Sequence, residues 1–213
     1  MAFIYRPIDP PSGAIVAEGV SEDAYLAVYA GNYYEWIEGT VIHLSPASLR
    51  HNDSLDFLKA LLVVYMKLRP IGRVVASPFT MRMTAIRRDR EPDIMVVMNA
   101  HRDRLHETYI DGAADICIEV VSPESVARDS DEKFTEYQKV GGREYWLFDM
   151  PNKQSRFYRL NAQGKFELQP LGANNDYRTP LLPDFVLPNE LLWGNTVPDL
   201  DDTGQYIRHL LKE

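Results

Sequence analysis

The chain has 213 residues, of which 45% are hydrophobic and 25% charged, a composition typical of one soluble globular domain and not of a disordered, collagen-like or coiled-coil protein. Its 23 basic and 31 acidic side chains give a net charge of −8, which excludes a uniformly basic nucleic-acid coat but not a local basic patch. The single cysteine, Cys117, excludes a disulfide framework and favours a reducing, cytoplasmic setting. No apolar run approaches the about 20 residues of a membrane span.

The first third of the chain predicts a helix, a hairpin and a longer helix. Ser21 is a helix-capping residue followed by two acids, so a helix is expected to begin there and to end near Gly31. Two β-rich runs, 34–37 and 40–44, flank a turn and predict a pair of strands. Apolar residues spaced three and four apart then predict an amphipathic helix over 47–69.

Two short apolar runs, 94–98 and 116–121, are the length of strands that are buried on both faces. The other predicted elements are a β-rich stretch at 73–84, a helix at 131–140, a core strand at 144–149, a hairpin made of 156–160 and 165–168, a proline-rich surface segment at 176–201 and a closing helix at 203–211. This order predicts one mixed α/β domain over 1–213, with a core at about 21–170 and a wrapping C-terminal tail at 171–213.

The most informative position is Glu119, because it interrupts an otherwise apolar strand. A buried carboxylate is costly unless it is paired, hydrogen-bonded or bound to a metal. A partner arginine or a polar sheet end would explain Glu119 equally well. Asp93, however, opens the neighbouring apolar run, and two acids on adjacent strands repel each other unless a divalent cation lies between them. Pro-Asp before a strand is also a common turn.

Lys133 precedes Tyr137 by four residues and therefore shares a helix face with it. A lysine beside two carboxylates could orient a water or neutralise phosphate charge, although an isolated helix lysine is usually solvated. Ser122 and Ser125 are interpreted as a turn and a helix cap, not as members of a serine triad. The chain has no phosphate-binding glycine loop of the P-loop or dinucleotide type, so nucleotide hydrolysis and dinucleotide binding have no support.

Four arginines lie shortly before Asp93 and form the clearest basic cluster: Arg82, Arg87, Arg88 and Arg90. Such a run is usually a solvated loop, but its place beside the acid pair makes phosphate binding an equal alternative. His51 and the turn acids Glu35 and Glu38 are weaker candidates, since a lone histidine or a hairpin acid is usually structural or solvated.

These residues resemble the Uma-two family of nucleases, which belongs to the restriction-endonuclease-like PD-(D/E)XK superfamily. The resemblance rests on Glu91-Pro92-Asp93-Ile94, on Asp115-Ile116-Cys117-Ile118-Glu119-Val120-Val121-Ser122-Pro123-Glu124-Ser125, on Asp129, Lys133, Tyr137 and Gly141, and on Glu144-Tyr145-Trp146-Leu147-Phe148-Asp149. Tyr34-Glu35-Trp36-Ile37-Glu38-Gly39, Ser45-Pro46 and His51 fit it as well, so it spans about 21–159.

The resemblance implies a mixed central β-sheet flanked by helices, with Asp93 and Glu119 as the metal ligands. The superfamily lysine stands two residues after the glutamate, where this chain has Val121. In the family this lysine is thought to come from the next helix, which makes it Lys133 here. Glu35, His51 and Tyr137 are possible auxiliary residues, and Thr40 stands where the family often has an acid.

The sequence therefore predicts an endonuclease that uses Mg²⁺, or Mn²⁺ in its place, to hydrolyse DNA. Asp93, Glu119 and Lys133 are its catalytic residues, and the four arginines hold the phosphate backbone. DNA is the expected partner, a homodimer would serve attack on two strands, and no membrane is involved. The alternatives are an inactive nucleic-acid-binding module or an accessory protein on the same fold.

Overall fold

The computed structural model describes residues 13–44, 49–121, 131–150, 152–193, 198 and 200–211. Its elements in chain order are β1 (Ile15–Ala17), α1 (Glu22–Val28), β2 (Tyr34–Ile37), β3 (Thr40–His43), α2 (Leu49–Leu68), β4 (Gly72–Ala76), β5 (Thr80–Met83), η1 (Thr84–Ile86), β6 (Arg88–Arg90), β7 (Ile94–Met98), η2 (Asn99–Arg104), β8 (Tyr109–Asp111), β9 (Ile116–Val121), α3 (Lys133–Lys139), β10 (Glu144–Asp149), β11 (Gln154–Leu160), β12 (Phe166–Gln169), β13 (Asp176–Tyr177), β14 (Leu187–Pro188), η4 (Asn189–Leu192) and α4 (Leu200–Leu211). None of the helices in this described part is both long and apolar enough to cross a bilayer.

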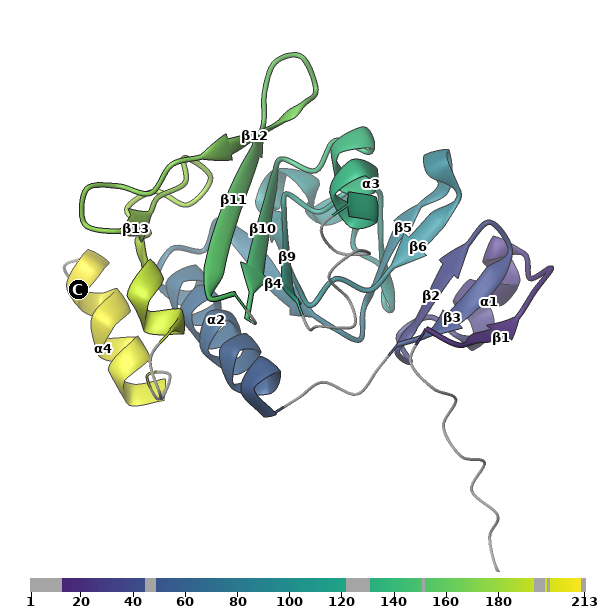
Figure 1. Ribbon diagram of the computed structural model, residues 1–213, viewed down its shortest axis with the longest axis horizontal. Helices are drawn as coiled ribbons and strands as arrows, with labels where there is room; N and C mark the ends of the chain where they lie inside the picture. The colour runs from purple at the N-terminus through teal and green to yellow at the C-terminus, as the bar shows by residue number, and fades with distance from the viewer. Residues whose placement is uncertain are drawn as a thin grey trace, which may run out of the picture.

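The central sheet has six strands in the order β12-β11-β10-β9-β7-β4 (Figure 1). Strands β9 and β10 pair in parallel, as expected for strands joined through a helix, and the other neighbours pair antiparallel. Every residue of β9 and of β10 is buried, which confirms the interpretation of these apolar runs as central strands.

Alternate residues of β9 face two different layers. Ile116, Ile118 and Val120 pack into the core that α2 and α4 cover, and α4 lies against α2. Cys117 and Val121 face the opposite side, where α3 and part of the second sheet lie. Glu119 lies two residues from each of them along the strand, so its side chain points to the same side, toward α3 and not toward the larger apolar core.

A second six-stranded sheet, in the order β1-β3-β2-β6-β5-β8, accompanies the mixed central sheet that the sequence predicted. In Figure 1 its β1–β3 end, together with α1, lies away from β11, β12 and α4. The pairing of β2 with β6 sets Trp36 opposite Asp89 and so brings Glu35 and Arg90 onto neighbouring strands. This sheet thus carries two charged residues toward α3.

The C-terminal segment differs from its prediction as a surface wrapping. Its apolar side chains complete the larger core instead, and the fully or almost fully buried ones are Tyr177, Leu182, Phe185, Leu187, Leu192 and Ile207. The Tyr65 hydroxyl of α2 donates a hydrogen bond to the Pro183 carbonyl at 2.8 Å. Prolines therefore mark turns between buried side chains here, not a loop outside the core.

Some predicted features lie outside the described residues. They are the first residues of the helix predicted at 47–69, the Ser45-Pro46 pair, the Ser122 and Ser125 turn, and Asp129.

Candidate active site

The antiparallel ladder between β7 and β9 sets the geometry of the acid pair. Ile94 pairs with Ile118, so continuing the register by one residue sets Asp93 opposite Glu119. Residues directly opposite each other in such a ladder project to the same face. The Val120 amide donates to Asp93 Oδ2 at 2.7 Å and fixes that carboxylate at the mouth of the strand. The sequence placed these two acids on adjacent strands, and the structure does so.

Glu119 is held by two side chains of α3. Lys133 Nζ lies 3.0 Å from Glu119 Oε2, and the Tyr137 hydroxyl donates to Glu119 Oε1 at 2.7 Å. Burial, and after it the charge of Glu119, raise the pKa of Tyr137 well above its ordinary value, so the phenol remains a donor. The predicted common face of Lys133 and Tyr137 is therefore present, and it is turned toward Glu119.

Glu35 of β2 is the third carboxylate of the site and is fully buried. Its Oε1 lies 3.4 Å from Lys133 Nζ, and its Oε2 accepts a hydrogen bond from Arg90 Nη1 at 2.7 Å. Lys133 thus lies between Glu35 and Glu119. Because the ammonium has a carboxylate on either side, its charge is balanced within the protein interior.

The side of the site that solvent reaches is formed by Asp93 and His51. Their side chains are 21% and 13% exposed, whereas those of Glu119 and Lys133 are 3% and 4% exposed. His51 Nε2, from the first turn of α2, lies 3.7 Å from Asp93 Oδ1. Asp93 and His51 are therefore more exposed than the Glu119–Lys133 pair.

The four arginines do not form one basic surface, which corrects the predicted cluster. Arg90 is fully buried among carboxylates, so it cannot contact phosphate in this structure. Arg82 pairs with Glu22 at 2.8 Å, and this hydrogen bond raises the pKa of the guanidinium. Arg88 pairs with Glu38 at 2.9 Å and keeps 22% of its side chain exposed, and Arg87 is exposed. Arg82, whose side chain is 22% exposed like that of Arg88, therefore remains a candidate for phosphate contact together with Arg87 and Arg88.

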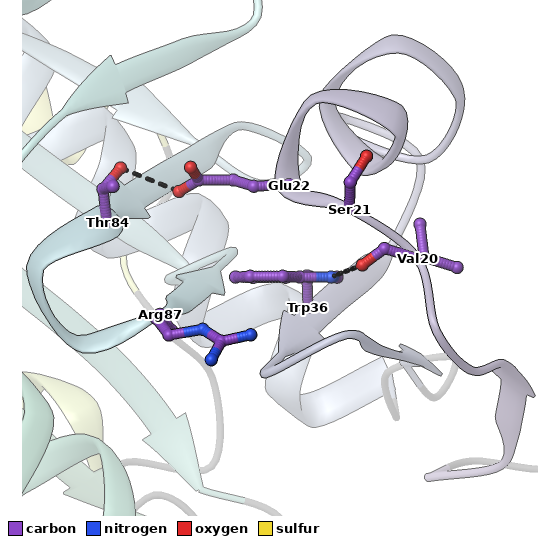
Figure 2. A pocket seen from close by; sticks show the side chains of 6 residues that line it. All are labelled: Val20, Ser21, Glu22, Trp36, Thr84 and Arg87. Carbon is purple, nitrogen blue, oxygen red and sulfur yellow. Dashed lines mark hydrogen bonds between the residues drawn. The ribbon is translucent and has the colours of Figure 1, made fainter.

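A pocket of about 350 Å³ lies between α1 and the β5–β6 turn, lined by Val20, Ser21, Glu22, Trp36, Thr84 and Arg87 (Figure 2). Trp36 and Glu35 are consecutive residues of β2 and project to opposite faces of the sheet. Figure 2 shows Glu22 bonded to Thr84 and the Trp36 indole bonded to Val20. The pocket therefore lies on the opposite face of this sheet from Glu35.

The donor atoms suit a hard cation that brings ligands of its own. Asp93 and Glu119 offer carboxylate oxygens, which Mg²⁺ prefers, and Mg²⁺ is commonly bound by one or two carboxylates with water and substrate phosphate completing its shell. Among the described residues, no group of three or more acidic, histidine or cysteine side chains is arranged to hold a metal alone. Asp93 and Glu119 are therefore the two carboxylates that the site could offer to such a cation.

Two members of the site, Glu132 and Glu136, were not predicted from the sequence. Arg90 Nε and Nη2 each lie 2.8 Å from an oxygen of Glu136, and Nη2 lies 3.2 Å from Glu132 Oε2. In the sequence, Glu132 and Glu136 are four residues apart, and each directly precedes Lys133 or Tyr137. This spacing could have indicated that the two acids share a helix face next to that of Lys133 and Tyr137. Val121, at the superfamily lysine position, is buried on the face that Lys133 reaches from α3.

Two mixed sheets with flanking helices, and two acids set opposite each other by the register of adjacent central strands, define a protein of restriction-endonuclease-like fold. A family model described as "Putative restriction endonuclease", Uma2, matches residues 22–190, and the chain belongs to this family. A solved structure described as a "putative nuclease belonging to DUF820" from Anabaena variabilis is similar at a TM-score of 0.60 and 19% identity, over 87% of this chain and 97% of that one. The search of curated proteins finds no match.

Proposed function

We propose that the protein is a Mg²⁺-dependent endonuclease that hydrolyses phosphodiester bonds in DNA, with Mn²⁺ able to replace Mg²⁺. The observation that carries the proposal is the meeting of Lys133 and Glu119 at 3.0 Å, with Asp93 set opposite Glu119 by the strand register. Asp93 directly precedes β7, Glu119 lies on β9 and Lys133 lies on α3, so three separate segments of the chain supply the two acids and the lysine. Membership of the family supports the same activity.

Asp93 and Glu119 would hold the metal, which when bound polarises a scissile phosphate and lowers the pKa of a bound water. The chain's own groups prepare both ligands. The Val120 amide restrains Asp93, and the Tyr137 hydroxyl restrains Glu119. Restraint of this kind fixes the donor oxygens before substrate arrives, and so reduces the reorganisation that the reaction needs.

Lys133 supplies a positive charge next to the reacting phosphate. Its ammonium is a compact charge with three donors, suited to neutralising charge that develops on phosphate oxygens or to orienting a water. Three arginines that keep exposed surface, Arg82, Arg87 and Arg88, would contact the DNA backbone together with His51. Such contacts do not distinguish one base from another, so they would give the enzyme no sequence preference.

An accessory protein without catalysis is the second candidate, and a specific observation favours it. The ion pair between Glu119 and Lys133 already satisfies the buried carboxylate, so this acid needs no metal to be stable. On this alternative Asp93 is a turn residue and the fold serves nucleic-acid binding or assembly. The two candidates differ in whether DNA is cut.

The test is cleavage of supercoiled plasmid and of labelled single- and double-stranded oligonucleotides with Mg²⁺ or Mn²⁺. We expect Asp93→Asn and Glu119→Gln to abolish cleavage, because both keep the side-chain shape and remove a charge that holds the metal. Lys133→Ala should slow cleavage by about 100-fold or more, the value of one positioned electrostatic group. Asp103→Asn, at an exposed aspartate of η2, is the matched control and should cut normally. Full activity of folded Asp93→Asn would refute the metal assignment.

We further propose a homodimer in the cytoplasm as the acting form. Symmetric cuts in two strands need two active sites, which a second copy would supply. Cys117 is a buried free thiol, which suits a reducing compartment. Light scattering of the protein with and without duplex DNA would reveal the dimer, and a monomer under both conditions would contradict it.

A further inference from the structure

Arg90 is the most deeply buried cation near the candidate active site. It lies on β6, three residues before Asp93, and its side chain has no exposed surface. A guanidinium withdrawn from water is costly unless carboxylates surround it. Burial opposes the charge, but Glu35 and then Glu136 outweigh it and keep the pKa of Arg90 well above its ordinary value. Arg90 is therefore a permanent charge inside the protein.

The contacts of Arg90 continue directly into the acid pair. Arg90 Nη1 donates to Glu35 Oε2 at 2.7 Å, and the other oxygen of Glu35 lies 3.4 Å from Lys133 Nζ. Lys133 in turn lies 3.0 Å from Glu119. One chain of alternating charges thus runs from β6 through β2 and α3 to β9. Two side chains, Glu35 and Lys133, connect Arg90 to Glu119, so a change in the position of Arg90 would alter the contacts of Glu119 through them.

Arg90 also holds the helix that carries Lys133. Its Nε and Nη2 grip the Glu136 carboxylate as a fork, with both distances at 2.8 Å. Glu132, the N-cap residue of α3, precedes Glu136 by one turn, and Lys133 and Tyr137 form the adjacent stripe. Since the two stripes are offset by one residue on one rigid helix, the orientation that brings Glu136 to Arg90 is the same one that brings Lys133 and Tyr137 to Glu119.

We propose that Arg90 is a positioning residue of the active site: it fixes Glu35 and the rotation of α3, and thereby holds Lys133 against Glu119. Its effect on cleavage rests on the proposed function, whereas its effect on Lys133 does not. The role differs from phosphate binding, for which a fully buried guanidinium is unavailable. It also requires arginine, since a lysine ammonium cannot grip two carboxylates with a planar fork.

The first test measures the accessibility of Lys133 and needs no substrate. Folded protein is treated with N-succinimidyl acetate, and acetylation of each lysine is followed by peptide mass spectrometry. Lys133 is buried and Lys139, on the same helix, is exposed and serves as the internal reference. In Arg90→Lys we expect Lys133 to be acetylated at least about tenfold faster relative to Lys139 than in the wild type, because local opening governs the reactivity of a buried group.

Arg159→Lys is the matched control. Arg159 also pairs with a fully buried carboxylate, Glu144, at 2.9 Å, but it lies on β11 at a different part of the sheet. This variant should leave Lys133 as protected as in the wild type. Continued protection of Lys133 in folded Arg90→Lys would overturn the proposal, as would equal loss of protection in both variants.

The second test measures activity in a double-mutant cycle. Arg90→Lys should lower kcat by about 10- to 100-fold with little change in KM, since misplacing a catalytic group by about 1 Å costs on this order. In the Lys133→Ala background the same change should have almost no further effect, because its route to the reaction has been removed. Independent, multiplying effects would show that Arg90 only stabilises the fold. If the wild type cuts no DNA, the proposed function fails while the acetylation result still decides the role of Arg90.

Glu136→Gln replaces Arg90→Lys if the latter does not fold. It weakens one arm of the fork and leaves Arg90 paired with Glu35. Glu132→Gln is its control, because that side chain is 60% exposed and its contact to Arg90 is the longer one, at 3.2 Å. We expect Lys133 to become more reactive in Glu136→Gln than in Glu132→Gln, and equal protection in the two would contradict the proposal.

Discussion

Removing the charge of Glu119 should destabilise the protein, and removing its partner as well should restore part of the loss. Glu119 and Lys133 are 3% and 4% exposed and 3.0 Å apart, so Glu119→Gln removes one carboxylate from a buried ammonium that still lies 3.4 Å from Glu35. Breaking a buried pair costs about 3–5 kcal/mol, and the second acceptor favours the lower end. At about 2–4 °C per kcal/mol for a chain of this size, we expect the melting midpoint to fall by about 6–12 °C.

The double variant Glu119→Gln/Lys133→Met carries no buried charge at either position and keeps the apolar stem of the lysine. It should be more stable than the sum of the two single changes predicts, by about 1–3 kcal/mol. Urea unfolding monitored by circular dichroism measures all four proteins, and an unchanged slope confirms that the unfolded reference is the same.

Glu190→Gln, at an exposed glutamate of η4, is the control for the loss of a carboxylate and should stay within about 0.5 kcal/mol of the wild type. If the double variant loses as much unfolding free energy as the two single variants together, the ion pair between Glu119 and Lys133 is not the reason that Glu119 is tolerated in its strand. The accessory alternative would then lose its supporting observation as well.

Three further predictions concern the metal, the pH dependence of stability and the core. Millimolar Mn²⁺ should raise the melting midpoint of the wild type by several degrees, since a hundredfold excess over Kd contributes about 2.7 kcal/mol, and Asp93→Asn should show no such rise. Burial, and then Glu22, raise the pKa of Asp89 to about 7 from 3.8, so wild-type stability should fall as pH rises through this interval. Between pH 5 and 8, the wild type should lose about 2–3 kcal/mol more stability than Asp89→Asn, as measured by thermal melts at fixed ionic strength. If the stabilities of the two proteins change with pH in parallel, the assignment to Asp89 is contradicted. Leu182→Ala should cost about 2–5 kcal/mol in urea unfolding because Leu182 is fully buried, whereas Leu168→Ala, at a residue 62% exposed, should cost far less.

The sequence predicted those parts of the molecule that local pattern determines. The apolar runs that became β7, β9 and β10 have the length and residue types of buried strands, and an acid at a strand position stands out against such a run. Lys133 and Tyr137 were placed on one face by spacing alone, and that face contacts Glu119. Helix periodicity and strand register are both short-range rules, so one sequence suffices to apply them.

The burial of Arg90 could not be predicted in the same way. Arg87, Arg88 and Arg90 read as one exposed basic loop, yet the pairing of β6 with β2 directs Arg90 inward to Glu35. Which strands pair is decided by contacts between residues far apart in the chain, and composition does not encode it. For the same reason the proline-rich segment was taken for a surface wrapping, although Leu182 and Phe185 lie within the core.

The bond between the Tyr65 hydroxyl and the Pro183 carbonyl joins residues 118 positions apart, and it bears on how the protein is made. During synthesis α2 leaves the ribosome long before the C-terminal segment, so the part of its apolar face that packs against this segment stays uncovered until the segment is made, although β4 and β9 are available earlier. Contacts of such long sequence separation also slow folding, because a large loop must close before they form. We therefore expect nascent chains stopped before Pro183 to be sensitive to protease and to engage chaperones, and full-length chains to acquire resistance only after the last helix has docked.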